Sequence, residues 1–177
     1  IDIETYSEVD IGKCGLYRYA TDPSFEILLV AWATDEGDGF GATRCADLAS
    51  GEPLPEELLE DFQSGNVRLI AHNASFERVC FSVHLQRHLP EQYLKPREFL
   101  SPDSWICTMV MAASLTLPMA LKDVGTVLKT SQQKDKEGER LIKLFSMPCK
   151  PTKSNGMRTR NLPEHYPADW EKFKYYC

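Results

Sequence analysis

The stretch 25–34 constrains the fold more than any other part of the chain. Its residues are nearly all apolar, and they include the β-branched and aromatic side chains that favour strands. A strand that is apolar on both faces has to be covered on both faces, so this stretch predicts a central strand of a sheet. An acidic turn that contains glycine follows at 35–41, and we expect residues 40–45 to return as a hairpin partner.

Residues 1–6 predict a second strand, which carries two carboxylates on one face. Side chains alternate between the two faces of a strand, so Asp2 and Glu4 point the same way. Ile1 and Ile3 point to the opposite face and are suited to a core. Two carboxylates this close repel each other, and a divalent cation bound to both would offset the repulsion. The alternative is a polar strand face exposed to solvent.

The rest of the N-terminal half contains turn signals, one helix and one short strand. Residues 7–15 hold turn-forming residues and predict a loop, and the alternating residues 16–19 favour a short strand or edge. Residues 53–63 predict a helix, with prolines at the start, glutamates in the first turn and Gly65 after the end. Residues 67–71, which are apolar apart from Arg68, predict a short strand.

The stretch 72–85 predicts a helix that begins near a carboxylate. Asn73 is a good N-cap residue, and the residues after it repeat with helical spacing. The apolar stripe consists of Phe76, Val79, Cys80 and Val83. Glu77 falls in the first turn, where the positive end of the helix dipole favours a carboxylate. Glu77 is therefore a partner of the dipole or a metal ligand, and the presence of Asp2 and Glu4 favours a third metal carboxylate.

The C-terminal half predicts four helices and one long loop. We expect a buried helix at 105–117, rich in Met and Ala, and an amphipathic helix at 120–128. The inward positions of the second helix are Leu121, Val124, Val127 and Leu128. A third helix is expected at 136–145 and a final one at 167–177. Residues 147–163 contain prolines and an Asn-Gly pair, and they predict a loop.

Length and charge bound the class of protein. The 177 residues suffice for one domain with a full core, and we expect a single domain over 1–177. The net charge is −6, but residues 129–160 carry nine basic and three acidic residues, so this arm is +6 and the remainder is −12. An acidic metal centre beside a basic arm suits a phosphate-bearing polymer, whereas a solvated basic loop is the alternative for the arm alone. No apolar run approaches the roughly 18 residues of a membrane span, and no signal peptide is recognisable.

Six cysteines are spread along the chain without a C-x-x-C pair. Structural zinc needs clustered ligands, so a zinc site is not expected. Cys80 and Cys107 lie in apolar stretches and are expected to be buried thiols. This cysteine usage fits a reducing, intracellular compartment.

Two motifs resemble those of a known family. Asp-Ile-Glu-Thr at 2–5, followed by His-Asn-Ala-Ser-Phe-Glu at 72–77, resembles the first and second motifs of the DEDD (RNase H-like) 3′–5′ exonucleases. The resemblance is greatest to the proofreading domain of phage or prophage family-A DNA polymerases, and it covers nearly the whole chain. The first motif maps onto Asp2 and Glu4, and the second onto Asn73, Phe76 and Glu77. The family more often has Asp where this chain has Glu77.

A third motif of this family is matched in part. Its tyrosine branch has a Tyr four residues before a final Asp, and Tyr176 matches the Tyr. The Asp would fall three positions beyond Cys177, so we expect the chain to be trimmed at both ends and cut within this motif. A histidine-branch motif made by His165 and Asp169 is disfavoured, because that branch spaces the two residues one position further apart and Pro167 interrupts the helix.

The resemblance implies an α/β fold, with an RNase H-like mixed β-sheet of about five strands flanked by helices. It also implies two divalent ions, Mg²⁺ or Mn²⁺. Asp2 would bind both ions, Glu4 the ion that activates water, and Glu77 the ion near the leaving 3′ oxygen. Tyr176 would stay neutral and orient the attacking water. The product would be a nucleoside 5′-monophosphate released from a single-stranded DNA 3′ end.

Residues beside the two intact motifs and in the basic loop are expected to contact nucleic acid. They are Thr5, Tyr6, His72, Asn73, Phe76, Lys150, Lys153, Arg158 and Arg160. Tyr6, His72 and Phe76 are equally suited to a core, and a core position is favoured for Phe76. The loop residues would contact backbone phosphates.

Three functions fit these residues. The leading one is a proofreading exonuclease that shares a parent chain with a polymerase domain, as a monomer without a membrane, in the cytoplasm of a bacterial host cell. The second is a free-standing DEDD ribonuclease, because the same carboxylates serve RNA and no 2′-hydroxyl contact is recognisable. The third is a catalytically inactive RNase H-like module that binds single strands, which the unusual Glu77 and the missing Asp keep open.

Overall fold

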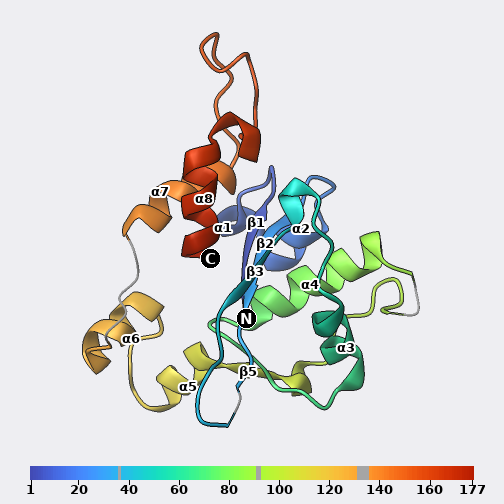
Figure 1. The fold of residues 1–177 in the computed structure, drawn as a ribbon, viewed down its shortest axis with the longest axis vertical. Coiled ribbons are helices and arrows are strands. Elements are labelled where there is room, and N and C mark those ends of the chain that lie inside the picture. Colours follow the sequence, from blue (N-terminus) through green and yellow to red (C-terminus); the bar gives the residue numbers. More distant parts are fainter. Residues whose placement is uncertain (36, 91–92, 131–135) are drawn as a thin grey trace. The chain divides into compact units, whose positions relative to one another are not determined.

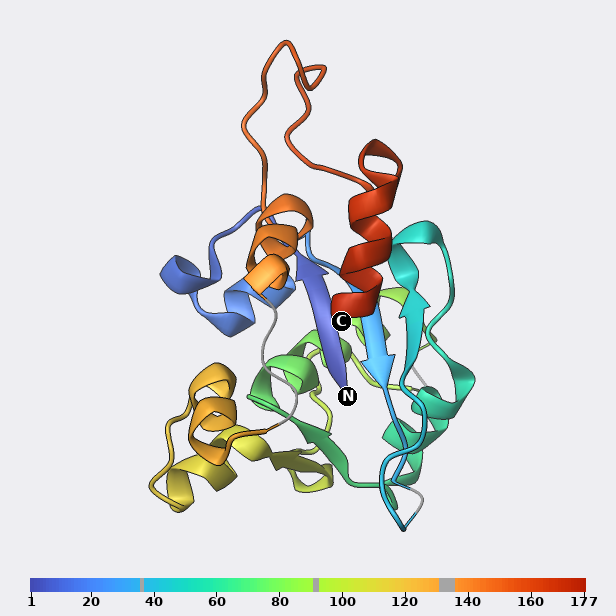
Figure 2. The same ribbon diagram turned by 60° about the vertical axis from the view of Figure 1, so that its left-hand side comes forward.

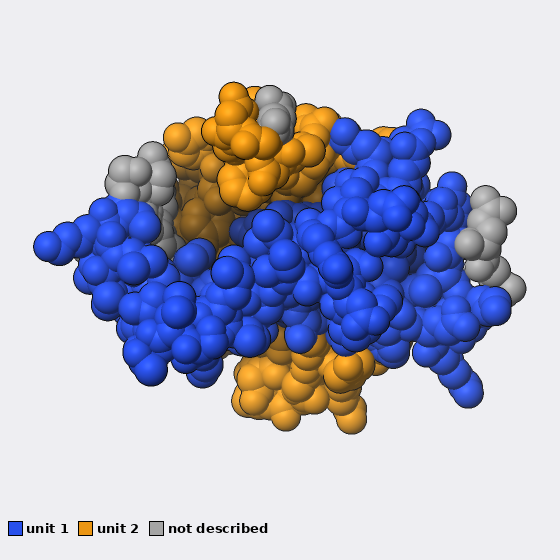
Figure 3. Space-filling model, turned by 90° about the horizontal axis from the view of Figure 1, so that it is seen from below, with its two compact units in different colours: residues 1–2, 56–136 blue, residues 3–55, 137–177 orange. Residues whose placement is uncertain are grey.

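The computed structural model describes residues 1–35, 37–90, 93–130 and 136–177. The chain forms two compact units, which Figure 3 shows in separate colours. Unit 1 consists of Ile1–Asp2 and Glu56–Lys136, and unit 2 of Ile3–Pro55 and Glu137–Cys177. The single domain expected over 1–177 stays a prediction. The chain passes from unit 1 into unit 2 within its first strand.

Unit 2 contains a three-stranded sheet in the order β1-β2-β3. Its strands are β1 (Asp2–Tyr6), β2 (Glu26–Trp32) and β3 (Arg44–Asp47), and neighbouring strands run in opposite directions (Figure 2). In the β2–β3 pair, Leu29 lies opposite Asp47 and Trp32 opposite Arg44. The residues of β2 are buried from Ile27 to Ala31. The predicted central strand is therefore confirmed, and so is its hairpin partner, although β3 begins later than expected.

Two C-terminal helices supply the core of unit 2. They are α7 (Lys136–Phe145) and α8 (Pro167–Tyr176), and both were predicted from the sequence. The core cluster combines them with the sheet through Tyr6, Leu28, Leu29, Leu141, Phe145, Trp170 and Phe173. The ring centroid of Phe145 lies 4.8 Å from that of Trp170 and 5.4 Å from that of Phe173. Between α7 and α8 runs a long loop without helix or strand, which ends at a 3₁₀ turn, Pro163–His165.

The loop expected at 7–15 and the strand expected at 16–19 are wrong. The structure has two short helices there, α1 (Ile11–Cys14) and α2 (Leu16–Thr21). The Asp10 side chain caps α1 by accepting a hydrogen bond from the Gly12 N–H at 2.9 Å. The Asp10 cap explains the helix α1 within the expected loop. Residues 16–19 lie in α2, which has no side-chain cap, and four alternating residues are too few to distinguish strand spacing from helix spacing.

Unit 1 is built from short strands and helices around α4 (Ser75–His88). Strands β4 (Leu69–Ala71) and β5 (Trp105–Cys107) pair in parallel, with Leu69 opposite Trp105 and Ala71 opposite Cys107. Helix α3 (Glu56–Ser64) precedes β4, and it begins three residues after the start of the predicted helix. Its Phe62 ring lies 4.9 Å from the Phe81 ring of α4 and 6.4 Å from the Trp105 ring of β5.

The buried helix expected at 105–117 is wrong. Its first residues form β5, and the helix that follows, α5 (Thr108–Ser114), is largely exposed. Trp-Ile-Cys is a short apolar run with no periodicity of its own, so pairing with β4 decides that it is a strand. Helix α6 (Leu121–Leu128) confirms the predicted amphipathic helix. Its apolar residues Leu121, Val127 and Leu128 are each more than half exposed, so the prediction that they point inward is wrong.

Helices and sheets of both units establish an α/β class, as Figure 1 shows. The described residues contain five strands, which pair as a sheet of three and a sheet of two. The one mixed sheet expected from the resemblance stays a prediction. Among the described helices, none has the length and apolar character that crossing a membrane requires.

Candidate active site

The turn between β4 and α4 presents Glu77 at the start of α4. Asn73 has a φ of 71°, in the left-handed region that Asn tolerates better than most residues. Its carbonyl accepts a hydrogen bond from the Phe76 N–H at 2.8 Å. Ala74 takes the N-cap position, so the prediction that Asn73 caps the helix is wrong. Glu77 follows in the first turn, as expected.

Asp2 lies near Glu77 within unit 1. The N-terminal amine of Ile1 donates a hydrogen bond to the Ile70 carbonyl of β4 at 2.9 Å, which holds the start of β1 against β4. Because β4 leads through the turn into α4, this contact brings Asp2 toward Glu77. The negative charge of Asp2 acts on Glu77 as a result.

Glu77 is a buried carboxylate in a place that disfavours its charge. Its side chain is only 3% exposed, and Oε2 has no hydrogen-bond partner among the described residues. The pKa of Glu77 is raised to about 8, mainly by burial and to a smaller extent by the Asp2 charge. Its own backbone N–H and the N-terminal ammonium act in the opposite direction. A buried carboxylate beside a second carboxylate is a place where a cation would bind favourably.

The carboxyl groups of Asp2 and Glu77 fit a hard divalent ion, but the described residues around them do not supply a third ligand. Asp2 and Glu77 offer oxygen atoms, which Mg²⁺ and Mn²⁺ prefer, and the unpartnered Oε2 leaves a lone pair for a ligand. Glu4 lies two residues beyond Asp2 on β1 and is 8% exposed. Within the described residues, no three His, Cys, Asp or Glu side chains are grouped closely enough to hold an ion. Of the three predicted metal ligands, Asp2 and Glu77 are therefore the two that unit 1 brings near each other.

Cys107 lies at the same turn, where the sequence analysis expected only a buried thiol. Its sulfur is half-buried and lies against four backbone N–H groups, those of Asn73, Ala74, Met109 and Val110. Burial acts to raise the pKa of this thiol, but the hydrogen bonds of Val110 and the other N–H groups outweigh it and lower the pKa. Cys107 lies at this turn because it pairs with Ala71 in the parallel β4–β5 ladder. The sequence could have predicted its place only if residues 105–107 had been recognised as a strand.

His72 and Phe76 flank the turn in unit 1. The His72 ring contacts the Thr108 hydroxyl at 3.0 Å through Nδ1 and the Met119 carbonyl at 2.8 Å through Nε2. Both ring nitrogens are thus used inside unit 1. Phe76 is half-buried. It is therefore neither a full core residue nor a fully exposed one.

Thr5 and Tyr6 lie in the interior of unit 2. The Thr5 and Tyr19 hydroxyls are hydrogen-bonded at 2.8 Å, and Tyr6 is 1% exposed in the core cluster. Burial raises the pKa of the Tyr6 phenol, while the Arg160 charge lowers it. The Tyr6 hydroxyl has no hydrogen-bond partner among the described residues. Direct contact of these two side chains with nucleic acid does not fit their burial.

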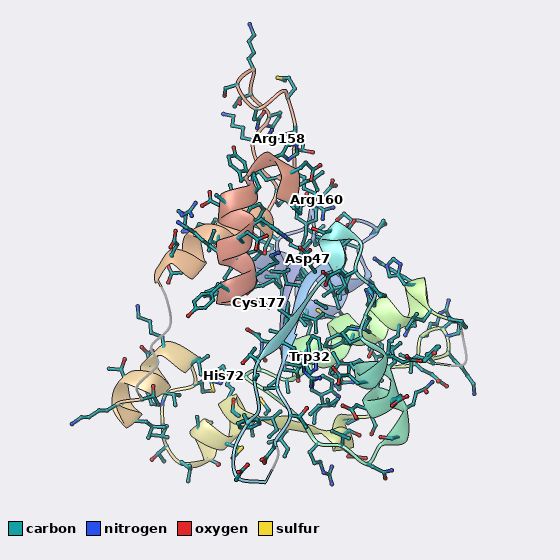
Figure 4. The ribbon with its side chains drawn as sticks, viewed as in Figure 1. Trp32, Asp47, His72, Arg158, Arg160 and Cys177 are labelled. Atoms are coloured by element: carbon teal, nitrogen blue, oxygen red, sulfur yellow. The ribbon has the colours of Figure 1, made fainter. Side chains whose placement is uncertain are left out.

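The basic loop splits into two exposed lysines and two arginines that fold back, as Figure 4 shows for the arginines. Lys150 and Lys153 are exposed. Arg158 donates to Asn161 Oδ1 at 3.0 Å and to the Tyr166 hydroxyl at 3.1 Å. Arg160 lies 4.1 Å from the centroid of the Tyr6 ring and donates to Glu26 Oε2 at 2.6 Å. The N-terminal part of the predicted basic arm, at 131–135, lies outside the described residues.

Tyr176 ends α8 in unit 2, with its ring against α7. The rings of Phe173 and Tyr176 stack with centroids 6.3 Å apart. A Cβ atom on Gly138 of α7 would lie 1.9 Å from Cε2 of Tyr176, so the ring needs glycine at that position. Both contacts fix the ring that the resemblance assigns to the attacking water.

The alternative third motif is used structurally. Asp169 accepts hydrogen bonds from Arg140 at 2.7 and 3.2 Å, and these lower the pKa of Asp169. His165 Nδ1 accepts from the Leu162 N–H at 2.9 Å. The choice of Tyr176 over His165 and Asp169 stays a prediction.

Comparison with known proteins adds a phage relative. The chain is similar to a DNA polymerase. That protein, from Bacillus phage SP02, is 49% identical over all 177 residues, and the chain spans a quarter (25%) of its length. No protein-family model and no solved structure matches the chain.

Proposed function

We propose that the chain is the 3′–5′ exonuclease domain of a DNA polymerase and removes nucleotides from a single-stranded DNA 3′ end. The observation that carries the proposal is the buried Glu77 carboxylate beside Asp2, whose Oε2 has no hydrogen-bond partner among the described residues. These two residues come from the two motifs that resemble exonuclease motifs. The similarity to a phage DNA polymerase over the full chain supports a role within such an enzyme.

The carboxylates would bind two divalent ions in this proposal. When bound, the ions would neutralise the scissile phosphate and make a hydroxide available near neutral pH. Asp2 would bind both ions, Glu4 the one beside the attacking water, and Glu77 the other. Ion binding would keep Glu77 ionised, although burial raises its pKa. The Tyr176 hydroxyl would orient the attacking water.

Lys150 and Lys153 are the exposed positive charges of the loop and would contact the phosphates of the incoming strand. Arg158 and Arg160 would act indirectly, because their hydrogen bonds hold the base of the same loop. At the turn before α4, Asn73 is exposed and Phe76 half-buried, so these two remain available to the terminal nucleotide.

The RNase H-like sheet is part of the proposal. Such a sheet would place β4 beside β1. Within unit 1, the hydrogen bond from Ile1 N to the Ile70 carbonyl joins the residue before β1 to β4, as that arrangement requires. The parallel β4–β5 pair would extend the same sheet.

The test is degradation of 5′-labelled single-stranded DNA with Mg²⁺ or Mn²⁺, by this chain and by the longest natural polypeptide that contains it. The proposal expects a ladder of shortened products that is lost in Asp2→Ala and Glu77→Gln. Glu60→Gln, which changes an exposed glutamate of α3, is the control and should keep the ladder. A ladder that survives Asp2→Ala would contradict the metal assignment. RNA of the same sequence, if degraded in preference to DNA, would favour the ribonuclease.

A second candidate is a module that binds single strands without cutting them. The observation that favours it is the lack of a three-ligand group among the described residues. Filter binding with and without EDTA separates the two candidates. Strand binding that does not need the cation, together with no ladder in either polypeptide, would favour the second candidate.

A further inference from the structure

Two cysteines that are far apart in the sequence face each other in unit 2. Cys45 lies on β3 and is exposed, and Cys177 follows the last residue of α8 and is half-buried against the core cluster. The Cys177 thiol lies in side-chain hydrogen-bonding contact with the Cys45 sulfur and lowers the pKa of the Cys45 thiol. All six cysteines lie in the described part of the chain, and none forms a disulfide.

Neighbouring contacts explain why the two thiols meet. Asp47 lies on the same face of β3 as Cys45, because residues two apart in a strand share a face. Asp47 Oδ2 accepts a hydrogen bond from Trp170 Nε1 at 2.7 Å, and Lys174 Nζ lies 4.0 Å from the same oxygen. Trp170, Lys174 and Cys177 are four and three residues apart, so they lie on one side of α8. This side of α8 therefore lies against the face of β3 that carries Cys45.

The other four sulfurs have different surroundings. Cys14 donates to the Gly15 carbonyl at 3.4 Å, and Cys149 donates to the Arg158 carbonyl at 3.4 Å. Cys107 lies against backbone N–H groups, and Cys80 is fully buried in α4. Each of these four sulfurs thus meets backbone groups or the core, whereas Cys45 meets a second thiol.

We propose that Cys45 and Cys177 form a redox-sensitive modification site, at which a small disulfide oxidant such as glutathione disulfide closes a bond that ties the end of α8 to β3. The proposal does not rest on the proposed exonuclease activity, although Cys177 follows Tyr176, the residue proposed to orient the attacking water. Disulfides in reducing compartments are transient, which suits a bond that opens and closes with the thiol pool.

The reaction has two thiol–disulfide exchange steps. The Cys45 thiolate attacks one sulfur of glutathione disulfide, forms a mixed disulfide, and releases one glutathione as a thiolate that takes up the proton of Cys45. The Cys177 thiolate then attacks the Cys45 sulfur, forms the Cys45–Cys177 bond, and releases the second glutathione. Two protein thiols are oxidised and one glutathione disulfide is reduced to two thiols. The sulfurs need to move from hydrogen-bond contact to about 2 Å.

Two properties make Cys45 the attacking residue. Its exposure admits the oxidant, whereas Cys177 is half-buried. The hydrogen bond from Cys177 lowers the pKa of the Cys45 thiol, against the effect of burial, and so increases its thiolate fraction. Asp47 and Glu52 raise this pKa and Lys174 lowers it.

The experiment is oxidation of the reduced chain with glutathione disulfide, followed by alkylation, thiol counting in denaturant and peptide mapping. We expect two of the six thiols to be lost, a peptide that joins Cys45 to Cys177, and reversal by dithiothreitol. Cys177→Ser should stop at a glutathione adduct on Cys45. Cys14→Ser, the matched control, should still close the pair.

Other outcomes would overturn the proposal. One is a glutathione adduct on Cys45 that persists in the unchanged chain, because the second exchange would then have failed. Another is a disulfide that forms between chains, seen as a dimer on a non-reducing gel. Equal formation of other cysteine pairs would show that the contact has no special reactivity. Matching near-ultraviolet circular dichroism of the two serine variants and the parent chain verifies that all three are folded.

Discussion

Glu77 gives the candidate site its chemical character. A sequence pattern placed it in the first turn of a helix, and the structure shows that the side chain is buried with one oxygen unpartnered. Burial could not be predicted from the helix alone, because the position of Asp2 and the turn at Asn73 decide what surrounds the carboxyl group. The sequence thus predicted a carboxylate at the start of the helix, whereas the burial of Glu77 depends on tertiary contacts.

The raised pKa of Glu77 predicts a pH dependence of the metal-free protein. The pKa rises from an ordinary value of 4.5 to about 8, so the unfolded chain ionises first. Stability from this residue is therefore fully present below about pH 4.5 and is lost as the pH rises through about 8. The loss is at most about 5 kcal/mol, at about 1.4 kcal/mol per pKa unit. Glu77→Gln should remove it.

Urea unfolding in EDTA at pH 5 and pH 8 measures this effect. Relative to the parent chain, Glu77→Gln should gain stability at pH 8 but little at pH 5. Glu60→Gln should follow the parent chain at both. Added Mn²⁺ should restore stability at pH 8 in the parent chain and less in Glu77→Gln. Equal pH dependence of the parent chain and Glu77→Gln would show that Glu77 is not buried as described.

We expect substitution of Arg160 to lower stability, although the sequence analysis assigned this residue to nucleic-acid binding. Its guanidinium lies over the Tyr6 ring and pairs with Glu26, so Arg160→Ala should cost about 1–3 kcal/mol of unfolding free energy. Lys153→Ala, in the same loop, should change stability by less than about 0.5 kcal/mol, because its side chain is exposed. Chemical denaturation of the two variants compares them directly. Equal losses would contradict the structural role of Arg160.

At the scale of elements, long periodic segments were predictable and short apolar runs were not. Helix α7 has the bounds that its pattern predicts, and β2 lies where its apolar run predicts a central strand. Strand β5 was missed because three apolar residues before a helix look like its first turn, and β4 decides otherwise. Periodicity finds the apolar face of α6, but it does not say whether anything covers that face.

Because Gly138 of α7 contacts the Tyr176 ring of α8, we expect Gly138→Ala to have opposite effects on stability in the parent chain and in a Tyr176→Ala variant. Gly138→Ala should favour the helix by about 1 kcal/mol, because Gly is a poor helix residue. In this chain the new Cβ would meet the Tyr176 ring, so the variant should instead lose stability and displace the ring. In a Tyr176→Ala background the clash is absent, and Gly138→Ala should stabilise the protein.

A double-mutant cycle on unfolding free energy measures the coupling, which should exceed about 1 kcal/mol. If the proposed function is right, Gly138→Ala should also reduce the exonuclease rate, with less effect on strand binding. A Gly138→Ala effect of the same sign and size in both backgrounds would show that Tyr176 does not lie against α7.

At the scale of the whole molecule, the charge is divided rather than uniform. The chain is −6 overall, while residues 129–160 are +6. The sequence predicted this asymmetry and the α/β class. It did not predict that Arg158 and Arg160 would be used inside unit 2, because the partners Tyr166 and Tyr6 are brought to them by the fold. Lys150 and Lys153 therefore carry the exposed charge of the loop.

The charge division predicts a salt dependence that depends on the loop lysines. Each phosphate contact adds about 0.7 to the slope of log affinity against log salt for single strands. Replacing both Lys150 and Lys153 by Ala should therefore lower the slope by about 1.4 and weaken binding to all sequences alike.

Lys13→Ala, which removes an exposed lysine paired with Asp10 outside the loop, is the control and should leave the slope unchanged. Fluorescence anisotropy with labelled oligonucleotides at several salt concentrations measures both slopes. An unchanged slope in the double variant would place the nucleic-acid surface elsewhere, whereas an equal decrease in Lys13→Ala would show that the net charge, and not the loop, sets the affinity.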